Sequence, residues 1–278
     1  MSVHVVRHAS DGDAWEFVHA APDPRLRGFV GSYCAYDERT STFTRRRELP
    51  AARIVLIVNL GEPILVRAPG GAWSEHDSFV AGVHDTYALT ETRGAQRGLQ
   101  VDLVPGGAQA LLGVAMHELA AEVVTLEALY GRAGVLLREA LAAAPGWAER
   151  FALLDAFFLA RLDDAFSPVP SVTRALTRLH ATSGALPVAV LAAELGCSRR
   201  HLTARFREQV GVPPKLYGRI LRFRRALALA GTGDWAQIAL ACGYYDQAHL
   251  IRDFNQFAGG PPTDVAARMN PDGGGVRA

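Results

Sequence analysis

The feature of this sequence that most constrains its fold is a weak internal repeat within residues 191–262. The segments 191–196 and 238–243 both read as a short apolar helix that ends at a glycine. The second copy then has one extra residue in its turn, and from there the matches lie 48 residues apart: His201-Leu202 and His249-Leu250, Phe206 and Phe254, Gly211 and Gly259, and Pro213-Pro214 and Pro261-Pro262. Each copy predicts an apolar helix, a turn with glycine, a second helix and a Gly-x-Pro-Pro stop. This is the pattern of a helix-turn-helix unit, present twice.

Helical geometry predicts which side chains of each second helix point outward, since successive residues turn by about 100° around the axis. In the first copy Ser198 is a good N-cap. The inward positions are apolar in both copies: Leu202, Phe206 and Val210, then Leu250, Phe254 and Phe257. The outward positions are polar or small: Arg200, Thr203, Ala204 and Arg207, then Gln247, Ala248, Ile251, Arg252 and Asn255.

These outward residues have the chemistry of DNA base recognition. Arginine can donate two hydrogen bonds to guanine, glutamine suits adenine, and a small neighbour lets a helix approach the base edges. We therefore predict that both second helices read DNA. For His201 and His249, at equivalent points of the repeat, a structural hydrogen bond is favoured over a base contact.

The segment 215–230 between the two copies predicts one amphipathic connector helix. Its apolar side is formed by Leu216, Ile220, Phe223 and Leu227, and its arginines are Arg219, Arg222, Arg224 and Arg225. If the two reading helices lie in successive major-groove segments, they should be about 34 Å apart. The connector arginines, Arg222 among them, could bind phosphates, which adds affinity without sequence choice.

Charge is distributed unevenly along the chain. Residues 170–270 contain 13 arginine and lysine residues and 6 aspartate and glutamate residues, whereas the remaining residues contain 16 and 22. A basic C-terminal third beside an acidic remainder is typical of a polyanion-binding module joined to a module of another kind. A solvated basic face without a partner is the alternative that charge alone leaves open.

The C-terminal third resembles the AraC-type transcription regulators. The resemblance covers Pro170 to Met269 and rests on Ile238-Ala-x-x-Cys-Gly-Tyr-x-Asp-Gln-Ala-His-Leu-x-Arg-x-Phe254 with Gly259 to Pro262. The first copy matches through Leu191-Ala, Ser198-x-x-His-Leu202 and Arg205-Phe-Arg207, and the connector through Pro214, Tyr217 and Arg222. Val265 and Ala266 depart from the family, which usually has an aromatic residue and an arginine there, so a terminal contact is expected to be weaker.

The resemblance implies a regulator whose second helices read the major groove of double-stranded DNA, which by position indicates Arg200, Thr203 and Ala204, then Gln247, Ala248, Ile251 and Arg252. It also implies contact with RNA polymerase, a homodimer and a place in the bacterial cytoplasm at the nucleoid. The sequence predicts no membrane segment and no secretory signal, and its three cysteines are too scattered for a disulfide framework.

The N-terminal part predicts a small antiparallel sheet or barrel. The predicted strands are 54–58, 64–66, 79–83, 87–92 and 99–104, of which the last alternates as a half-buried strand should. Helical spacing follows from 107 to 123, then over 135–143 and 147–162. Residues 15–131 also resemble, more loosely, cupin-like sensor domains, through Pro24-x-Leu26, Phe29-Val30, Leu49-Pro50, Leu60-Gly61 and Leu111-Leu112-Gly113.

The expected architecture is α+β, with a β-rich cupin-like domain and its following helices before an all-α domain of two helix-turn-helix units. The predicted boundaries are 1–131 for the effector or regulatory domain, 132–169 for a helical connector with a linker near Ser167, Pro168 and Pro170, 170–270 for the DNA-binding domain, and 271–278 for a disordered tail. A small-molecule effector is expected in the first domain, and strand alternation suggests a cavity lined by Trp73, Phe79, Tyr87 and Leu103.

Enzymatic alternatives find little support in the sequence, and we expect no catalytic residue, metal or cofactor. His76, His84 and His117 lack the His-x-His spacing of a metal-binding cupin, and Ala121 stands where a zincin would have its second histidine. Gly231 to Ala236 imitates a dinucleotide motif, but it follows an arginine-rich helix rather than a strand. Two other classes remain open: an architectural DNA binder without an effector and, less favoured, a DNA-repair fusion with a reactive cysteine.

Overall fold

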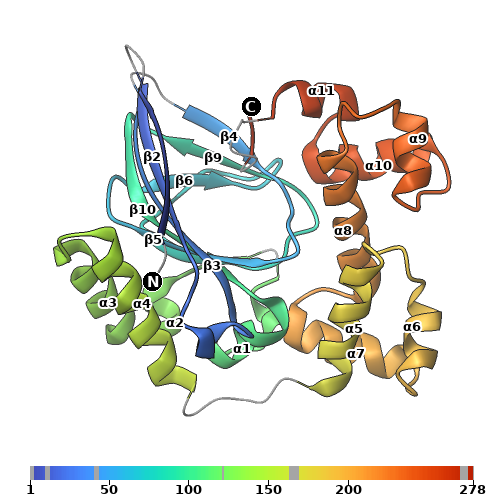
Figure 1. The fold of residues 1–278 in the computed structure, drawn as a ribbon, viewed down its shortest axis with the longest axis horizontal. Helices are drawn as coiled ribbons and strands as arrows, with labels where there is room; N and C mark the ends of the chain where they lie inside the picture. Colours follow the sequence, from blue (N-terminus) through green and yellow to red (C-terminus); the bar gives the residue numbers. More distant parts are fainter. Residues whose placement is uncertain are drawn as a thin grey trace.

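The computed structural model describes residues 3–9, 13–40, 44–120, 122–162, 169–269 and 275–277. A β-rich N-terminal part with flanking helices lies beside an all-helical C-terminal part (Figure 1). The architecture is α+β, as the sequence predicts. Within the described residues no helix is long and apolar enough to cross a membrane.

Two antiparallel sheets form the N-terminal part. The larger has the order β1 (Val3–Ala9), β2 (Asp13–Ala20), β3 (Val30–Thr40), β10 (Ala95–Leu103), β5 (Ile54–Asn59), β8 (Ser78–Ala81) and β11 (Val123–Thr125). The smaller has the order β12 (Val276–Arg277), β4 (Thr44–Glu48), β9 (Ala88–Thr92), β6 (Ile64–Arg67) and β7 (Ser74–His76). The five predicted strands are confirmed as β5, β6, β8, β9 and β10.

Helices cover the outer face of the larger sheet: α1 (Pro105–Leu112), α2 (Leu126–Tyr130), α3 (Arg132–Ala143) and α4 (Trp147–Leu162). Tyr33 of β3 stacks on Phe151 of α4 at 5.6 Å between ring centroids, and its hydroxyl donates to Asp155 at 2.8 Å. Leu99, Val101 and Leu103 of β10 belong to the same buried core. The predicted alternation of this strand is therefore confirmed, and the helices are what cover its apolar side.

The inner face of the larger sheet is turned toward the smaller sheet. Ile57 and Phe79 form a separate apolar cluster there with Ile64 and Val66 of the smaller sheet. The two faces of the larger sheet thus pack against different layers, which decides where each predicted pocket residue lies.

Two predictions about the N-terminal part and the tail are wrong. The helical spacing over 107–123 does not make one helix, because α1 ends at Leu112 and Gly113 follows with φ of +71°. A short turn, Met116–Glu118, comes next, and Val123 pairs with Ala81 as a strand. The tail is not wholly disordered, because Val276 is buried and pairs with Arg47 of β4; residues 270–274 and 278 lie outside the described residues.

The C-terminal part is built from seven helices within its described residues: α5 (Pro170–Ala181), α6 (Val188–Glu194), α7 (Arg199–Val210), α8 (Pro214–Ala228), α9 (Trp235–Ala241), α10 (Gln247–Ala258) and α11 (Pro262–Ala267). Pro170 begins α5, whereas Ser167 and Pro168 of the predicted linker are outside the described residues. The domain boundaries stay predictions. The N-terminal and C-terminal parts contact each other directly. One such contact is the Tyr217 hydroxyl, which donates to the Ala52 carbonyl at 3.2 Å and lies 2.9 Å from His180.

Candidate nucleic-acid interface

The first unit of the repeat consists of α6 and α7 with a short turn between them. Ser198 caps α7 as predicted, because its hydroxyl accepts from the backbone N–H of His201 at 3.1 Å. The predicted inward residues Leu202, Phe206 and Val210 are fully buried. The outward side chains are accessible: Arg200, Ala204 and Arg207 are exposed and Thr203 is half-buried.

The second unit, α9 and α10, repeats this construction with different residues. Asp246 caps α10 by accepting from His249 N–H at 2.7 Å, and Asp234 caps α9 in the same way through Gln237 N–H. The predicted inward residues Leu250, Phe254 and Phe257 are fully buried. On the outward side, Gln247, Ala248, Arg252 and Asn255 are exposed and Ile251 is half-buried.

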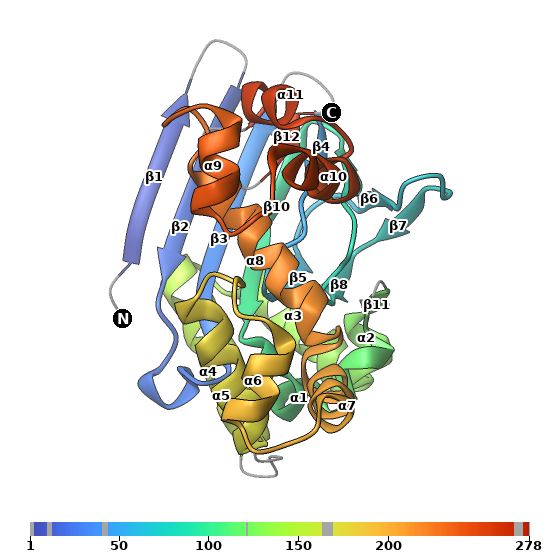
Figure 2. The ribbon, with the colours of Figure 1, turned by 90° about the vertical axis from the view of Figure 1, so that its right-hand side faces the viewer.

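The helix α8 joins the two units as the predicted connector. Figure 2 shows α7 and α10 on the same side of α8, one below the other, with α6 and α9 on the other side. Ile220, Phe223 and Leu227 are buried, and Leu216 is half-buried. The two reading helices are therefore presented together, which is the arrangement that a two-part DNA site requires.

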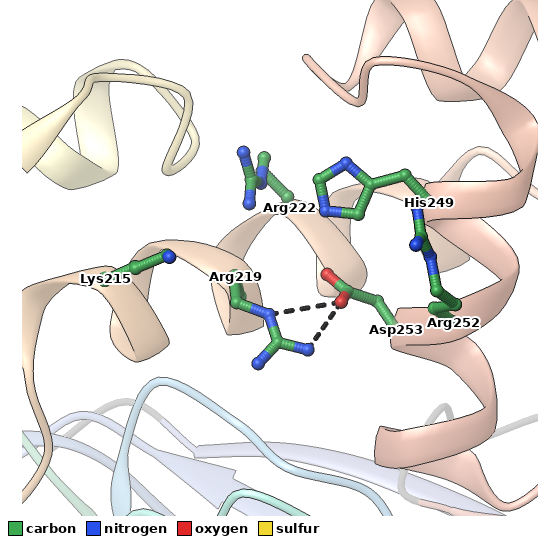
Figure 3. Close-up of a pocket in the computed structure, with 6 residues that line it drawn as sticks. All are labelled: Lys215, Arg219, Arg222, His249, Arg252 and Asp253. Atoms are coloured by element: carbon green, nitrogen blue, oxygen red, sulfur yellow. Dashed lines mark hydrogen bonds and ion pairs between the residues drawn. The ribbon is translucent and has the colours of Figure 1, made fainter.

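A basic cleft of about 510 Å³ lies between α8 and α10 (Figure 3). Its lining is five basic residues and one carboxylate: Lys215, Arg219, Arg222, His249, Arg252 and Asp253. The carboxylate is already paired, since Arg219 donates to Asp253 Oδ1 through Nε at 3.1 Å and Nη2 at 2.6 Å. The remaining positive charge can face an anion.

The connector arginines divide into different roles. Arg219 is held by Asp253 and by Gln256, whose Oε1 accepts at 2.7 Å. Arg224 is turned toward the β-rich part, where burial and the nearby Arg53 lower its pKa. Of the connector's four arginines, Arg222 lines the cleft without an ion pair among the described residues, and its guanidinium lies over the Tyr244 ring at 5.3 Å.

Tyr244 shows how tightly the second turn is packed. It is buried, and its ring meets His249 edge-on at 5.2 Å between centroids. Burial, together with the neighbouring Asp253 carboxylate, raises the pKa of Tyr244. His249 therefore has a packing role, while the predicted structural hydrogen bond of the His201 ring is not observed among the described contacts.

Comparison with known families identifies this region. Residues 191–268 match the model of the helix-turn-helix domain family, and residues 18–125 match a domain of unknown function (DUF6597). The C-terminal part is an AraC-type helix-turn-helix domain. The chain is accordingly a DNA-binding transcription regulator.

Several solved structures of AraC-type proteins are similar to this chain, each with a TM-score below 0.5. A transcriptional regulator from Chromobacterium violaceum with an AraC-type DNA-binding domain is 28% identical over 36% of this chain and 91% of its own, with a TM-score of 0.33. ToxT from Vibrio cholerae, bound to (E)-4-(8-methylnaphthalen-1-yl)but-3-enoic acid, is 10% identical over 92% of this chain and 99% of its own, with a TM-score of 0.48. The AraC-like activator CuxR is 15% identical over 82% and 86%, with a TM-score of 0.34. A comparison with curated proteins finds no match.

The AraC-type domain also contains an exposed aromatic residue that the helical-wheel reasoning missed. Tyr245 is 88% exposed and directly precedes the N-cap Asp246 of α10. The extra residue of the second turn was the available signal, because the first unit has only Cys197 between Gly196 and Ser198.

The four residues expected to line an effector cavity are not brought together. Leu103 lies in the core under the helices, and Phe79 lies between the two sheets. Trp73 is in the connection between β6 and β7, beneath the guanidinium groups of Arg45 and Arg67. Tyr87 lies against the C-terminal domain, under Arg47. Alternation identified Phe79 and Leu103 as buried positions but not the face on which each one lies, and Trp73 and Tyr87 are only half-buried.

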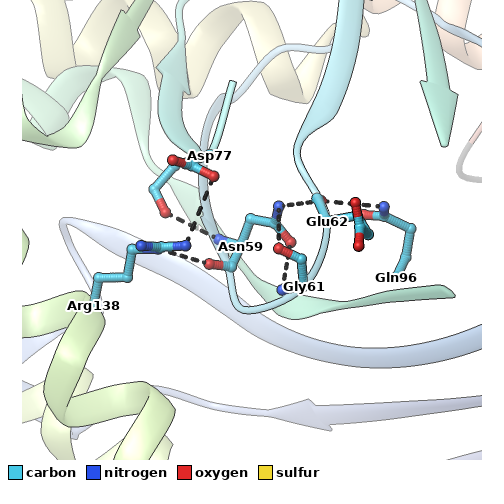
Figure 4. A network of polar contacts seen from close by, with 7 residues as sticks. Asn59, Gly61, Glu62, Asp77, Gln96 and Arg138 are labelled. Carbon is cyan, nitrogen blue, oxygen red and sulfur yellow. Dashed lines mark hydrogen bonds and ion pairs between the residues drawn. The ribbon is translucent and has the colours of Figure 1, made fainter. Parts of the chain in front are cut away.

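One buried polar network in the N-terminal part is structural (Figure 4). Asn59 is fully buried; its amide donates to the Glu62 carbonyl at 2.5 Å and its Oδ1 accepts from Gly61 N–H at 3.1 Å. Arg138 of α3 donates to the Asn59 carbonyl at 3.1 Å. These bonds close the turn after β5 and attach α3 to it. In the part of the chain that the structure describes, no cluster of histidine, cysteine or acidic residues could hold a metal.

Proposed function

We propose that this regulator recognises a two-part, asymmetric DNA site through one chain. Residues of α7 read one major-groove segment: Arg200, Thr203, Ala204 and Arg207. Residues of α10 read the next: Gln247, Ala248, Ile251, Arg252 and Asn255. The observation that carries this proposal is that α8 presents both capped helices on one side, with their outward residues exposed or half-buried.

We further propose that the cleft between α8 and α10 receives the DNA backbone. Arg222 is the phosphate contact in this proposal, since it is a charged group without a carboxylate partner among the described residues. Phosphate contacts position the protein and strengthen binding to every sequence, whereas the outward residues of α7 and α10 supply the choice of sequence.

Selection of bound duplexes from a random DNA pool tests the proposal. A sharp two-part motif is expected, with its parts about 10 base pairs apart. Arg252→Ala should weaken binding to the selected duplex more than to random duplex, and Arg222→Ala should weaken both and reduce the salt slope by about 1. Unchanged affinity and footprint for Arg252→Ala would show that α10 does not read DNA.

Control by a small-molecule effector at the N-terminal part is a further element of the proposal. The inner face of the larger sheet supports it, because it carries polar side chains opposite the smaller sheet. Cys34 and Tyr36 of β3 are only half-buried, and Glu38 pairs with Arg46 of β4 at 2.6 Å. Phe79 remains in this proposed site, whereas Trp73, Tyr87 and Leu103 lie elsewhere.

Adding metabolite extracts during the DNA selection tests the effector. A shift in affinity or in the selected motif supports it, and a motif and affinity that no extract changes would favour the effector-independent architectural binder. Contact with RNA polymerase, a homodimer and action at the bacterial nucleoid in the cytoplasm complete the proposal, on the family resemblance.

A further inference from the structure

The N-terminal part contacts the C-terminal end of each reading helix, at equivalent points of the repeat. In the first unit, Gly211 has φ of +93°, and a Cβ there would lie 2.9 Å from the Met116 carbonyl oxygen. In the second unit, Gly259 has φ of +70°, and a Cβ there would lie 2.5 Å from Tyr87 Cε1. Both glycines follow the last residue of their helices, α7 and α10.

Arg47 of β4 makes the central contact between the β-rich part and α10. Arg47 Nη1 donates to the carbonyl of Ala258 at 3.0 Å and to that of Gly259 at 3.3 Å. Its guanidinium lies over the Tyr87 ring at 5.4 Å from the centroid. A cation at this place is favourable, because the carbonyls at a helix C-terminus lack intrahelical donors and carry partial negative charge.

A second set of contacts between the β-rich part and α10 is made through Gln256. The Gln256 amide donates to the Asp85 carbonyl at 3.0 Å, and the Thr86 hydroxyl donates to the Gln256 carbonyl at 3.0 Å. The Gln256 Oε1 accepts from Arg219 of α8. The segment 85–87, the reading helix and the connector are therefore joined at one residue.

These contacts leave the reading face of α10 free. They lie at the C-terminal end of the helix, whereas Gln247, Ala248 and Arg252 are exposed nearer its start. The β-rich part and a DNA duplex can therefore contact α10 at the same time.

We propose that Arg47 is a positioning residue for the second reading helix, so that the β-rich part holds both reading helices at the placement that a two-part site needs. This proposal rests on the proposed function. Two linked binding units gain affinity when their geometry lets both engage at once, and pre-organisation removes the cost of ordering them on DNA. Without Arg47 the second unit is attached by α8 and fewer contacts, so it engages DNA less often.

The test compares Arg47→Ala with Arg45→Ala, a matched variant on the same strand whose arginine pairs with Glu91 and lies over Trp73. The probes are the duplex recovered by selection with the wild-type chain and a shortened duplex that contains only the α7 part. Arg47→Ala should weaken binding to the full duplex about tenfold and leave the shortened duplex unchanged. Its footprint should persist over the α7 part and fade over the α10 part. Arg45→Ala should match wild type, and Arg47→Lys should restore most of the loss.

Gln256→Ala is the second variant, since it removes an exposed side chain that joins α10 to the segment 85–87 and leaves β4 unchanged. We expect about a threefold loss on the full duplex alone. Unchanged or tighter binding by both variants would overturn the proposal, and so would an equal loss on both duplexes, which indicates a general structural defect. Arg252→Ala is measured beside them: if it also leaves binding unchanged, the proposed function is what fails.

Discussion

The two helix-turn-helix units have the same helices and caps, but they are attached to the rest of the molecule by different chemistry. The first unit packs directly on the β-rich part, since α7 contacts α1 and the short turn Met116–Glu118, and Val210, Leu111 and Met116 are all buried. The second unit is attached by Arg47, Gln256 and other polar groups. Apolar burial is non-directional, whereas hydrogen bonds depend on distance and angle, so the second unit depends more on the geometry of its partners.

The same contrast holds inside the units. Asp253 of α10 forms a buried ion pair with Arg219, with side-chain exposures of 2% and 24%. The equivalent position in α7 is Arg205, which pairs with Glu208 at the surface. The repeat thus preserves the fold and changes the interaction that fixes each reading helix to its surroundings.

The largest expected effect comes from breaking the buried pair. Asp253→Ala leaves the partly exposed Arg219 without its carboxylate, and removing one partner of such a shielded pair costs up to about 3 kcal/mol of stability. Glu208→Ala, the surface counterpart, should cost less than about 1 kcal/mol. Chemical denaturation followed by circular dichroism measures both. Equal losses would remove the distinction between the units.

The next effect concerns DNA recognition, in which the two units should be alike. Arg200→Ala and Arg252→Ala should each lose about 1–3 kcal/mol of discrimination, since each removes a predicted bidentate guanine contact. Competition binding with the selected duplex and with duplexes altered in one part measures this. If only one variant loses discrimination, the other helix does not read bases.

The C-terminal units were predictable because caps, the i, i+4 spacing of Leu202 and Phe206, and the Gly-x-Pro-Pro stops are all local signals. The strand β4 was not predictable, because Thr44–Glu48 reads as a charged surface segment. Its Arg46 pairs with Glu38 of β3 in the other sheet, and its Arg47 finds its partner 211 residues away, at Ala258.

The effector site was predictable only in part, for a geometric reason. Alternation in β10 separates Leu103 from Asp102, but it does not say which side packs on helices and which faces the second sheet. The helical spacing of 107–123 failed at Gly113, since one residue with positive φ ends a helix whatever apolar residues follow.

A smaller effect should distinguish the two N-caps. Ser198→Ala and Asp246→Ala each remove an acceptor for a backbone N–H and should cost about 1 kcal/mol. Asp246→Ala should cost slightly more at low salt, because a carboxylate also complements the positive end of the helix. Thermal unfolding at low and high salt measures the difference. An identical salt response of the two variants would contradict this.

The smallest effect is a pH dependence at α5, the helix that precedes the first unit. Burial lowers the pKa of His180, which lies 2.9 Å from the Tyr217 hydroxyl. A histidine whose pKa is lower in the fold than its ordinary 6.5 is neutral when folded, so stability is full above that pH and falls as pH drops. His180→Gln should lose less stability than wild type between pH 7.5 and pH 5.5. A parallel decline in the two proteins would show that His180 does not contribute.

The most direct test of the central claim is guanine protection in the major groove of the selected duplex. We predict two protected clusters about one helical turn, or 10 base pairs, apart on one face of the DNA. Arg200→Ala should erase one cluster and Arg252→Ala the other. A single cluster, or loss of the same cluster in both variants, would contradict the account of two reading helices that one chain presents side by side.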